Sequence, residues 1–253
     1  MHKPIIPWIG GKRRLAKHIL PHINGHQTYV EPFAGGAAIF FMKEPSKVEV
    51  INDINSDLVT LYRVVKYHLD ELIRHFRWAL VSREEFLLAK RVDPETLTDI
   101  QRAARFFFLQ KSAFGGLVQN RSFGVAASTP PRLNLLRIEE DLSQAHLRLA
   151  RTYIEHLPWA ECIRRYDKPE TVFFLDPPYW GTEGYDVEFG LEQYQQIADL
   201  AGSIQGHMLI TLNDIPEMRE IFAGLNIETV PIAYTVSKSS QAKRNELIIR
   251  NWP

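Results

Sequence analysis

The sequence predicts an α/β protein in which a sheet with helices is interrupted by a helical insertion. Three observations predict this fold. Short apolar runs that stop at polar residues, prolines or glycines occur near both ends of the chain and indicate buried strands. Helical segments alternate with these runs, as in an α/β sheet. The middle of the chain is mainly helical in its periodicity, so we expect residues 1–55 and 152–253 to form one domain and residues 56–151 to form the insertion.

The composition is that of an ordinary globular protein. With 253 residues, 45% of them hydrophobic and 24% charged, the chain suits one domain with a substantial insertion. No apolar run approaches the roughly 20 residues that span a bilayer, and the N-terminus lacks the apolar segment of a signal peptide. The single cysteine, Cys162, favours a reducing cytoplasm and, with scattered histidines, argues against a zinc site. We therefore expect a cytoplasmic location, no membrane contact and no metal.

The N-terminal segment is predicted to be extended and then to turn on Gly10 and Gly11 into a helix that Pro21 stops. A Gly-Gly-Lys sequence at a helix start resembles a phosphate-binding loop, but the pattern fails. No glycine stands five residues before Gly11, and Arg13 occupies the Ser/Thr position. What is left is a helix start with a cation, Lys12, which suits one carboxylate or phosphate.

The next segment reads as a βαβ unit. A short strand at residues 28–31 leads through Gly35 and Gly36 into a helix that ends near Met42, and a second strand covers residues 47–51. Asp53 follows 18 residues after Gly35, about where a dinucleotide-type unit places an acid for ribose hydroxyls. Since Gly-x-Gly-x-x-Gly is absent, a smaller adenosine-containing ligand is better supported than NAD. The alternative is an ordinary turn with a solvent-exposed aspartate.

The helical middle carries a local excess of basic residues. Helices are predicted from residue 56 to about 110 and from 133 to 151, with a hairpin or loop near residues 118–125. Six basic residues and no acidic residue lie between positions 100 and 138: Arg102, Arg105, Lys111, Arg121, Arg132 and Arg137. A second acid-free stretch, 229–245, includes Lys238. Although the net charge is zero, these stretches suit phosphate contacts; a solvated basic helix face is the alternative.

The second half of the chain again alternates strands and helices. Strands are predicted at residues 152–156, 172–175, 208–212, 228–236 and 246–250, and helices at 159–166, 191–201 and 215–222. The strand at 172–175 runs directly into Asp176-Pro177-Pro178-Tyr179, and the two prolines end it. This loop offers a carboxylate, a carbonyl that the following proline cannot partner and an aromatic face, a set that suits a planar, amino-bearing substrate such as a nucleobase. A turn whose tyrosine caps the core is the alternative.

Four motifs in this order resemble the Dam-type family of DNA adenine N6-methyltransferases. They are Pro-x-x-Pro-Trp-x-Gly-Gly-Lys, Glu-Pro-Phe-Ala-Gly-Gly, Asn-Asp-x-Asn and Asp-Pro-Pro-Tyr, and the resemblance extends from Trp8 to the closing Asn-Glu-Leu-Ile-Ile. It implies a Rossmann-like methyltransferase sheet with helices on both faces, in which the helical insertion recognises the target. It also implies transfer of a methyl group from S-adenosyl-L-methionine to N6 of an adenine flipped out of double-stranded DNA, by a protein that we expect to be monomeric.

The resemblance also implies roles for particular residues. The target adenine would be bound by the Asp176 carboxylate, the carbonyl of Pro177 and the ring of Tyr179. Residues expected to bind the methyl donor are Trp8, Lys12, Glu31, Phe33, Ala34, Gly35, Asp53, Ile54 and Asp176. Residues expected to contact DNA are Lys111, Asn120, Arg121, Arg132 and Lys238, which lie in the two acid-free stretches.

Two departures from the family pattern put the target sequence GATC in doubt. Pro7 precedes Trp8 where Dam itself carries a lysine, and the segment from Gln119 to Gly124 is only loosely like Dam's recognition hairpin. Other readings are a methyltransferase acting on N4 of cytosine, on adenine in RNA or on a glutamine side chain, and a catalytically silent DNA-binding protein. Asp176 favours adenine, because the cytosine and glutamine enzymes more often carry Ser or Asn before Pro-Pro.

Overall fold

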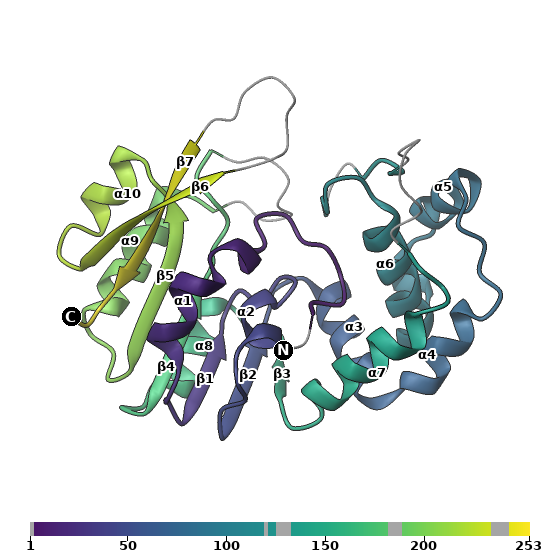
Figure 1. Ribbon diagram of the computed structural model, residues 1–253, viewed down its shortest axis with the longest axis horizontal. Coiled ribbons are helices and arrows are strands. Elements are labelled where there is room, and N and C mark those ends of the chain that lie inside the picture. The colour runs from purple at the N-terminus through teal and green to yellow at the C-terminus, as the bar shows by residue number, and fades with distance from the viewer. Residues whose placement is uncertain (1–2, 119–120, 125–132, 182–188, 234–242) are drawn as a thin grey trace.

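The computed structural model describes residues 3–118, 121–124, 133–181, 189–233 and 243–253. In these residues one seven-stranded sheet forms the centre of the molecule (Figure 1). Its strands are β1 (Thr28–Glu31), β2 (Val48–Asn52), β3 (Tyr153–Glu155), β4 (Thr171–Leu175), β5 (His207–Asn213), β6 (Asn226–Ala233) and β7 (Lys243–Arg250). Their order in the sheet is β3-β2-β1-β4-β5-β7-β6. The first five are parallel, and β7 runs antiparallel to both β5 and β6. The predicted α/β sheet is confirmed.

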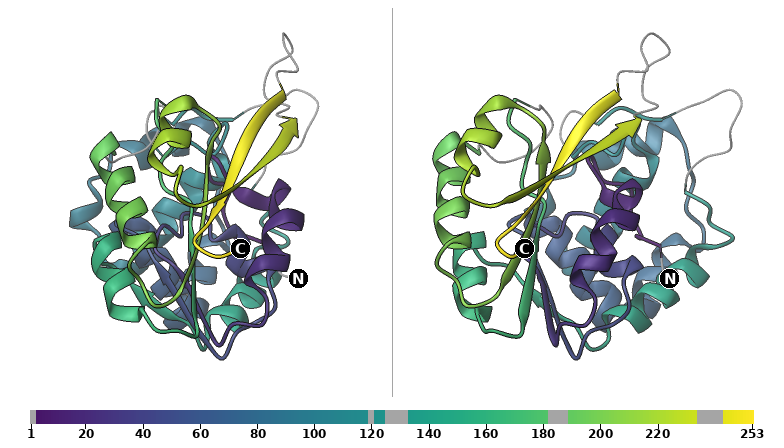
Figure 2. Two further views of the ribbon diagram at one scale, coloured as in Figure 1. Left: turned by 90° about the vertical axis from the view of Figure 1, so that its left-hand side faces the viewer. Right: turned by 60° about the vertical axis from the view of Figure 1, so that its left-hand side comes forward.

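Helices cover both faces of this sheet, as Figure 2 shows from the side. One face carries α8 (Trp159–Tyr166), α9 (Leu191–Ala201) and α10 (Pro216–Ile221), and the other carries α1 (Ala16–Ile23), α2 (Ala38–Met42) and the 3-10 turn η1 (Lys12–Arg14). Each layer has its own apolar core, because alternate strand residues point to opposite faces. In β1, for example, Tyr29 belongs to one core and Val30 to the other.

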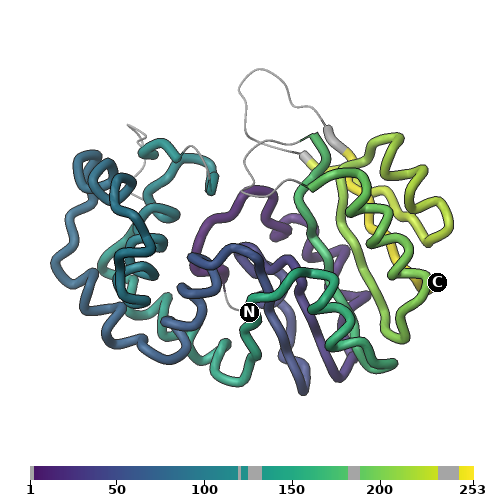
Figure 3. The backbone as a smooth tube through the Cα atoms, turned by 180° about the vertical axis from the view of Figure 1, so that it is seen from behind, coloured from purple at the N-terminus to yellow at the C-terminus, as the bar shows by residue number. Residues whose placement is uncertain are grey.

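The insertion is a bundle of helices beside the sheet, clearest from behind in Figure 3. It comprises α3 (Ser56–Tyr67), α4 (Leu69–Phe76), α5 (Arg83–Arg91), the 3-10 turn η2 (Pro94–Thr96), α6 (Asp99–Ser112) and α7 (Ile138–Leu149). A capping box begins α6, where Thr98 and Gln101 satisfy each other's backbone N–H groups. The phenylalanines at 106–108 are buried, as a core role requires. This core is continuous with the one beneath α1 and α2, so the insertion packs directly on the sheet.

Two predicted helix boundaries are wrong. Pro21 lies inside α1, which continues to Ile23, because Ile19 and Ile23 are fully buried and hold the last turn in place. The helix expected from residue 133 begins at Ile138, after a turn in which Arg137 N–H donates to the carbonyl of Asn134. The segment expected to be helical from 56 to about 110 consists of four α-helices and η2, in agreement with the prediction.

The hairpin or loop expected near residue 120 is closed by antiparallel pairing. Phe114 N–H donates to the carbonyl of Ser122 at 2.9 Å, and Gly124 N–H donates to that of Ser112 at 2.8 Å. We call residues 112–124 the closing hairpin. Its tip and Val125 lie outside the described residues.

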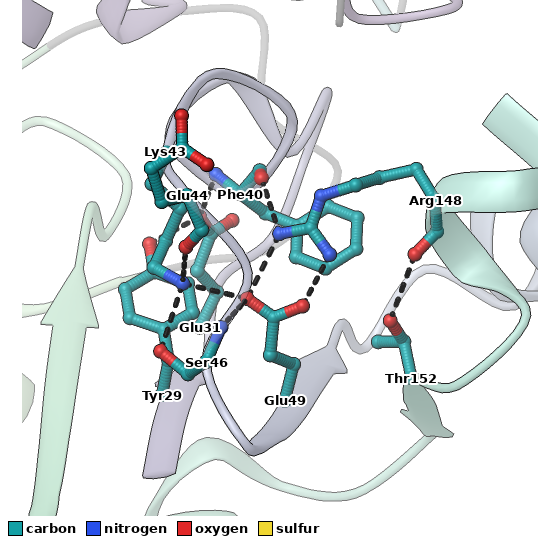
Figure 4. Close-up of polar contacts among 9 residues, drawn as sticks. All are labelled: Tyr29, Glu31, Phe40, Lys43, Glu44, Ser46, Glu49, Arg148 and Thr152. Atoms are coloured by element: carbon teal, nitrogen blue, oxygen red, sulfur yellow. Dashed lines mark hydrogen bonds and ion pairs between the residues drawn. The ribbon is translucent and has the colours of Figure 1, made fainter. Parts of the chain in front are cut away.

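A buried ionic cluster ties the insertion to the sheet (Figure 4). Arg148 of α7 donates to both carboxylate oxygens of Glu49 on β2 and, at 2.8 Å, to the carbonyl of Phe40. Lys43 Nζ lies 2.6 Å from the same Glu49 carboxylate. Burial by itself would raise the pKa of Glu49, but the hydrogen bonds from Arg148 and Lys43 outweigh it and lower that pKa. The last helix of the insertion is therefore fixed to the second strand.

Candidate active site

A cavity of about 660 Å³ opens at the carboxyl ends of β1, β2 and β4. The chain leaves β1 toward β2 on one side and leaves β4 toward β5 on the other, so this is the point in the sheet where the strand order reverses. Ligands of open α/β sheets bind in the crevice at such a point. All nine residues predicted to bind the methyl donor line the cavity: Trp8, Lys12, Glu31, Phe33, Ala34, Gly35, Asp53, Ile54 and Asp176.

The loop after β1 is hydrogen-bonded to a carboxylate that directly follows β2. Gly35 N–H donates to Asp53 Oδ2 at 2.8 Å, and Asn55 N–H donates to Asp53 Oδ1 at 2.9 Å. Burial raises the pKa of Asp53, and these backbone donors act against that rise. Asp53 therefore organises the loop, while Ile54 beside it leaves 49% of its surface exposed at the cavity. The alternative of an ordinary turn with a solvent-exposed aspartate does not describe this residue.

Trp8 packs on the glycine pair from the other side. Gly35 has a φ of +48°, and a Cβ placed on it would lie 2.6 Å from Trp8 Nε1. Only glycine fits there, because both the backbone conformation and the indole exclude a side chain. Gly116 of the closing hairpin has a φ of +75°, and a Cβ placed on it would lie 3.2 Å from the backbone N of Trp8. Gln110 is buried and donates at 2.9 Å to the carbonyls of both Pro7 and Gly116, so the N-terminal segment is joined to that hairpin.

Glu31 forms part of the cavity wall at the end of β1. Its Oε1 accepts from Tyr29 Oη at 2.5 Å and from Phe40 N–H at 2.7 Å. Burial raises the pKa of Glu31 to about 8, and the two hydrogen bonds act in the opposite direction. The side chain is thus a structural part of the wall whose charge is suppressed near neutral pH.

Asp176 stands at the end of β4 and is bound on one oxygen only. Oδ1 lies 2.7 Å from Lys12 Nζ and accepts from Thr211 Oγ1 at 3.1 Å. No described residue donates to Oδ2, and 21% of the side-chain surface is exposed. Burial raises the pKa of Asp176 to about 6, although the Lys12 ammonium acts to lower it. The carboxylate is therefore held in one orientation, with one oxygen that accepts no hydrogen bond from the described part of the chain.

The loop after Asp176 presents the tyrosine beside this carboxylate. Lys12 Nζ lies 4.5 Å from the ring centroid of Tyr179, and Tyr179 Oη donates to Glu246 Oε2 at 2.8 Å. Lys12 also donates to the carbonyl of Gly10 at 2.6 Å. The lysine predicted to face a ligand's carboxylate thus contacts Asp176 in this structure.

Several residues of the site were not predicted from the sequence. Phe33 stacks on Trp159 with ring centroids 5.9 Å apart and meets the edge of Phe189 at 5.7 Å. Trp159 Nε1 donates to Gln193 at 2.8 Å, and all four side chains line the cavity. Phe33 was predicted, but Trp159, Gln193 and Phe189 come from α8, α9 and the segment before α9, so no local motif marks them. Thr211 on β5, which donates to Asp176, and Glu246 on β7, which accepts from Tyr179, were also missed.

The residues predicted to contact DNA are placed only in part. Lys111 lines the cavity, and burial lowers its pKa. Arg121 folds back on the insertion, with Nε donating to the carbonyl of Leu117 at 3.2 Å and its guanidinium 5.0 Å from the Phe106 ring. Asn120, Arg132 and Lys238 lie outside the described residues. Within the described part of the chain, no three His, Cys, Asp or Glu side chains gather as metal ligands, and no helix is long and apolar enough to cross a membrane.

The fold and the site define a Rossmann-like α/β methyltransferase with an Asp-Pro-Pro-Tyr loop at the edge of its cavity. The chain belongs to the family of D12 class N6 adenine-specific DNA methyltransferases, which its residues 8–231 match. It is an enzyme that methylates adenine N6 in DNA and uses a methyl donor; the alternative target groups are not favoured.

Curated relatives are similar over most of their length. The DNA adenine methylase of Haemophilus influenzae is 28% identical over 98% of this chain and 93% of its own. The type II methyltransferase M.CviBI of Paramecium bursaria Chlorella virus NC1A is 27% identical over 88% of this chain and 87% of its own. The DNA adenine methylase of Escherichia coli (strain K12) is 27% identical over 96% of this chain and 92% of its own.

Proposed function

We propose that the cavity binds S-adenosyl-L-methionine and that the Asp176–Tyr179 loop receives an adenine flipped out of double-stranded DNA. The observation that carries this proposal is the state of Asp176, whose Oδ1 is bound by Lys12 and Thr211 while Oδ2 has no donor among the described residues. A single oriented acceptor at the edge of a nucleotide-sized cavity suits the amino group of a base.

The cavity fits this donor in size and in chemistry. A volume of about 660 Å³ lies in the range of cofactor sites, and the aromatic wall of Phe33, Trp159 and Phe189 suits an adenine ring. The exposed side chain of Ile54 gives a further apolar surface, and Lys12 supplies a cation to the cavity wall. When bound, S-adenosyl-L-methionine supplies a methyl group on a positively charged sulfur.

The protein's part in the reaction is to orient the adenine amino group and to balance its charge. The N6 lone pair is delocalised into the ring, so N6 is a weak nucleophile. Asp176 Oδ2 and the carbonyl of Pro177 can each accept one N6–H hydrogen bond, which favours a tetrahedral nitrogen with its lone pair directed at the donor. The Asp176 carboxylate also faces the positive charge that develops on N6, a stabilisation that is prepared before the reaction. Tyr179 offers its ring face to the base.

We also propose that the insertion, residues 56–151, recognises the DNA target. Its closing hairpin is joined through Gln110 and Gly116 to the segment that holds Trp8, so recognition and donor site share one framework. Lys111, Asn120, Arg121, Arg132 and Lys238 are the proposed contacts, and the local excess of basic residues supports them. A monomer in the cytoplasm is the proposed state; the single buried Cys162 suits a reducing compartment.

Replacing Lys12 by Ala should weaken S-adenosyl-L-methionine binding roughly tenfold or more, and DNA binding less, because the donor's carboxylate loses a charged hydrogen-bond partner. Calorimetric titration of each ligand measures both, with Lys17→Ala on the exposed side of α1 as the matched loss of charge. Equal losses for donor and DNA would assign Lys12 to the DNA.

The pH profile gives the same variant a second readout. Methylation by the wild type should fall as the pH drops through about 6, since protonated Asp176 has lost its charge. Lys12 lowers the pKa of Asp176, so Lys12→Ala should move this fall to higher pH. An unmoved profile would mean that the ion pair does not persist in the complex.

Replacing Arg121 by Ala should impair methylation through DNA binding, with donor affinity unchanged. A base contact would cost about 1–3 kcal/mol and relax one target position, whereas a phosphate contact would weaken binding to all sequences alike. Turnover on a panel of oligonucleotides that differ at single target positions distinguishes the two. Arg74→Ala, an exposed arginine of α4, is the control, and unchanged turnover on every oligonucleotide would remove the closing hairpin from the interface.

A further inference from the structure

Glu246 is a buried carboxylate in a strand next to the reaction loop. Only 2% of its surface is exposed, and β7, on which it lies, is hydrogen-bonded to β5 and β6 on its two sides. Its partners across the sheet are Asn213 and Val230. A buried carboxylate is costly unless donors compensate it, so its partners are informative.

One of those partners is the phenol of Tyr179, whose Oη donates to Glu246 Oε2 at 2.8 Å. A hydrogen bond to an ionised acceptor is stronger and more directional than one between neutral groups. Pro177 and Pro178 already fix their own φ angles in the loop that precedes the tyrosine. The remaining freedom of the ring lies in its side-chain torsions, and the contact with Glu246 restrains these.

A second contact on the Tyr179 ring comes from Lys12. Lys12 Nζ lies over the ring, 4.5 Å from its centroid, and is itself held by Asp176 Oδ1. An ammonium group over one face and a carboxylate at the hydroxyl end define both the position and the tilt of the ring.

We propose that Glu246 is a positioning residue, which holds the Tyr179 ring at the angle at which it stacks on the flipped adenine. The inference rests on the proposed function, because it needs the target base at the Asp176–Tyr179 loop. Through the hydrogen bond from the Tyr179 hydroxyl, Glu246 acts on the ring that meets the target base.

Three variants test this role: Glu246→Ala, Glu246→Gln and Tyr179→Phe. Glu246→Ala and Tyr179→Phe each remove the hydrogen bond, so each should lower the single-turnover rate on a fully paired duplex by about tenfold. The double variant should be no slower than the slower single variant, since both changes break one interaction. Glu246→Gln keeps an acceptor oxygen and should retain most of the rate. Glu217→Gln, an exposed glutamate of α10, is the control.

Two further readouts separate positioning from a merely structural role. A duplex with a mismatch at the target adenine opens more easily and should restore part of the rate of Glu246→Ala and Tyr179→Phe, with calorimetric donor affinity unchanged. Among the described residues, the titratable groups around Asp176 are Lys12 on η1, Glu246 on β7 and Glu31 on β1, whose charge is suppressed near neutral pH, with Thr211 and Tyr179 as neutral neighbours. Burial is the main cause that raises the pKa of Asp176, and the Glu246 charge raises it further. On acidification, the methylation rate of Glu246→Gln should therefore fall at a lower pH than that of the wild type, whereas Tyr179→Phe should show no such shift.

The role of Glu246 would be overturned if the rate losses of the two single variants multiply in the double variant. It would also be overturned if the mismatched duplex restores none of the lost rate. If Glu246→Ala does not fold, Glu246→Gln is compared with Tyr179→Phe instead. The positioning role of Glu246 is then contradicted if Glu246→Gln is as slow as Tyr179→Phe and its pH profile is the same as that of the wild type. These outcomes leave the proposed function standing as long as Asp176→Asn is inactive and the wild type binds the donor. An active Asp176→Asn variant would instead remove the proposed function.

Discussion

Replacing Asp176 by Asn should lower the single-turnover methylation rate about 10²–10³-fold, which is the usual effect of removing one preorganised electrostatic partner. The structure explains why an isosteric change suffices. Lys12 and Thr211 both donate to Oδ1, so the remaining oxygen of an asparagine is held on their side. Its NH₂ group then occupies the position of Oδ2 and meets the adenine amino group donor to donor.

The same variant should fold, bind S-adenosyl-L-methionine within several-fold of the wild type and bind DNA. Asp176→Ala should lose at least as much rate, because it removes both acceptors and leaves Lys12 without its carboxylate. Single-turnover methylation with both ligands saturating separates the chemical step from binding. Asp70→Asn, an exposed change on α4, is the control. A near-normal rate for Asp176→Asn would show that the Asp176–Tyr179 loop is not the reaction centre.

The proposed reaction centre was predictable because its residues are adjacent in the sequence. An apolar strand that ends in Asp-Pro-Pro-Tyr places its polar groups at the carboxyl edge of a sheet whatever the remaining chain does. The number of residues between Gly35 and Asp53 was informative for a similar reason. In a βαβ unit the two strands are neighbours, so residues just beyond their carboxyl ends lie close together. The hydrogen bond from Gly35 N–H to Asp53 joins the two ends of that interval.

The side chains that complete the site were not predictable in this way. Trp159, Phe189 and Gln193 reach the cavity from segments whose approach to Phe33 depends on how two helices pack on the sheet. Glu246 was visible as part of the closing motif, but its contact with Tyr179 arises from the pairing of β7 with β5. Pro21 shows the converse case, in which a local signal for a helix end is overridden by the burial of Ile23.

Replacing Glu49 by Gln should cost about 3–5 kcal/mol of unfolding free energy, the typical effect of removing one partner from a buried ion pair. Glu49 is the shared anion of Lys43 and Arg148, so its loss leaves two buried cations together without compensation. Arg148→Met should cost less, because the Lys43–Glu49 pair is still balanced after that change. The charge balance of the cluster therefore predicts the order of the two effects.

Urea denaturation at neutral pH measures both variants, with Glu44→Gln at the neighbouring exposed position as the control. The pH dependence has a definite sign. Because the pKa of Glu49 is lowered in the folded protein, its ionised form stabilises the fold above the ordinary pKa of 4.5, and this contribution is lost as the pH falls through the folded value. The difference between wild type and Glu49→Gln should therefore shrink on acidification. A larger loss for Arg148→Met than for Glu49→Gln would mean that the attachment of α7 to the sheet, rather than the charge balance, sets the stability of this junction.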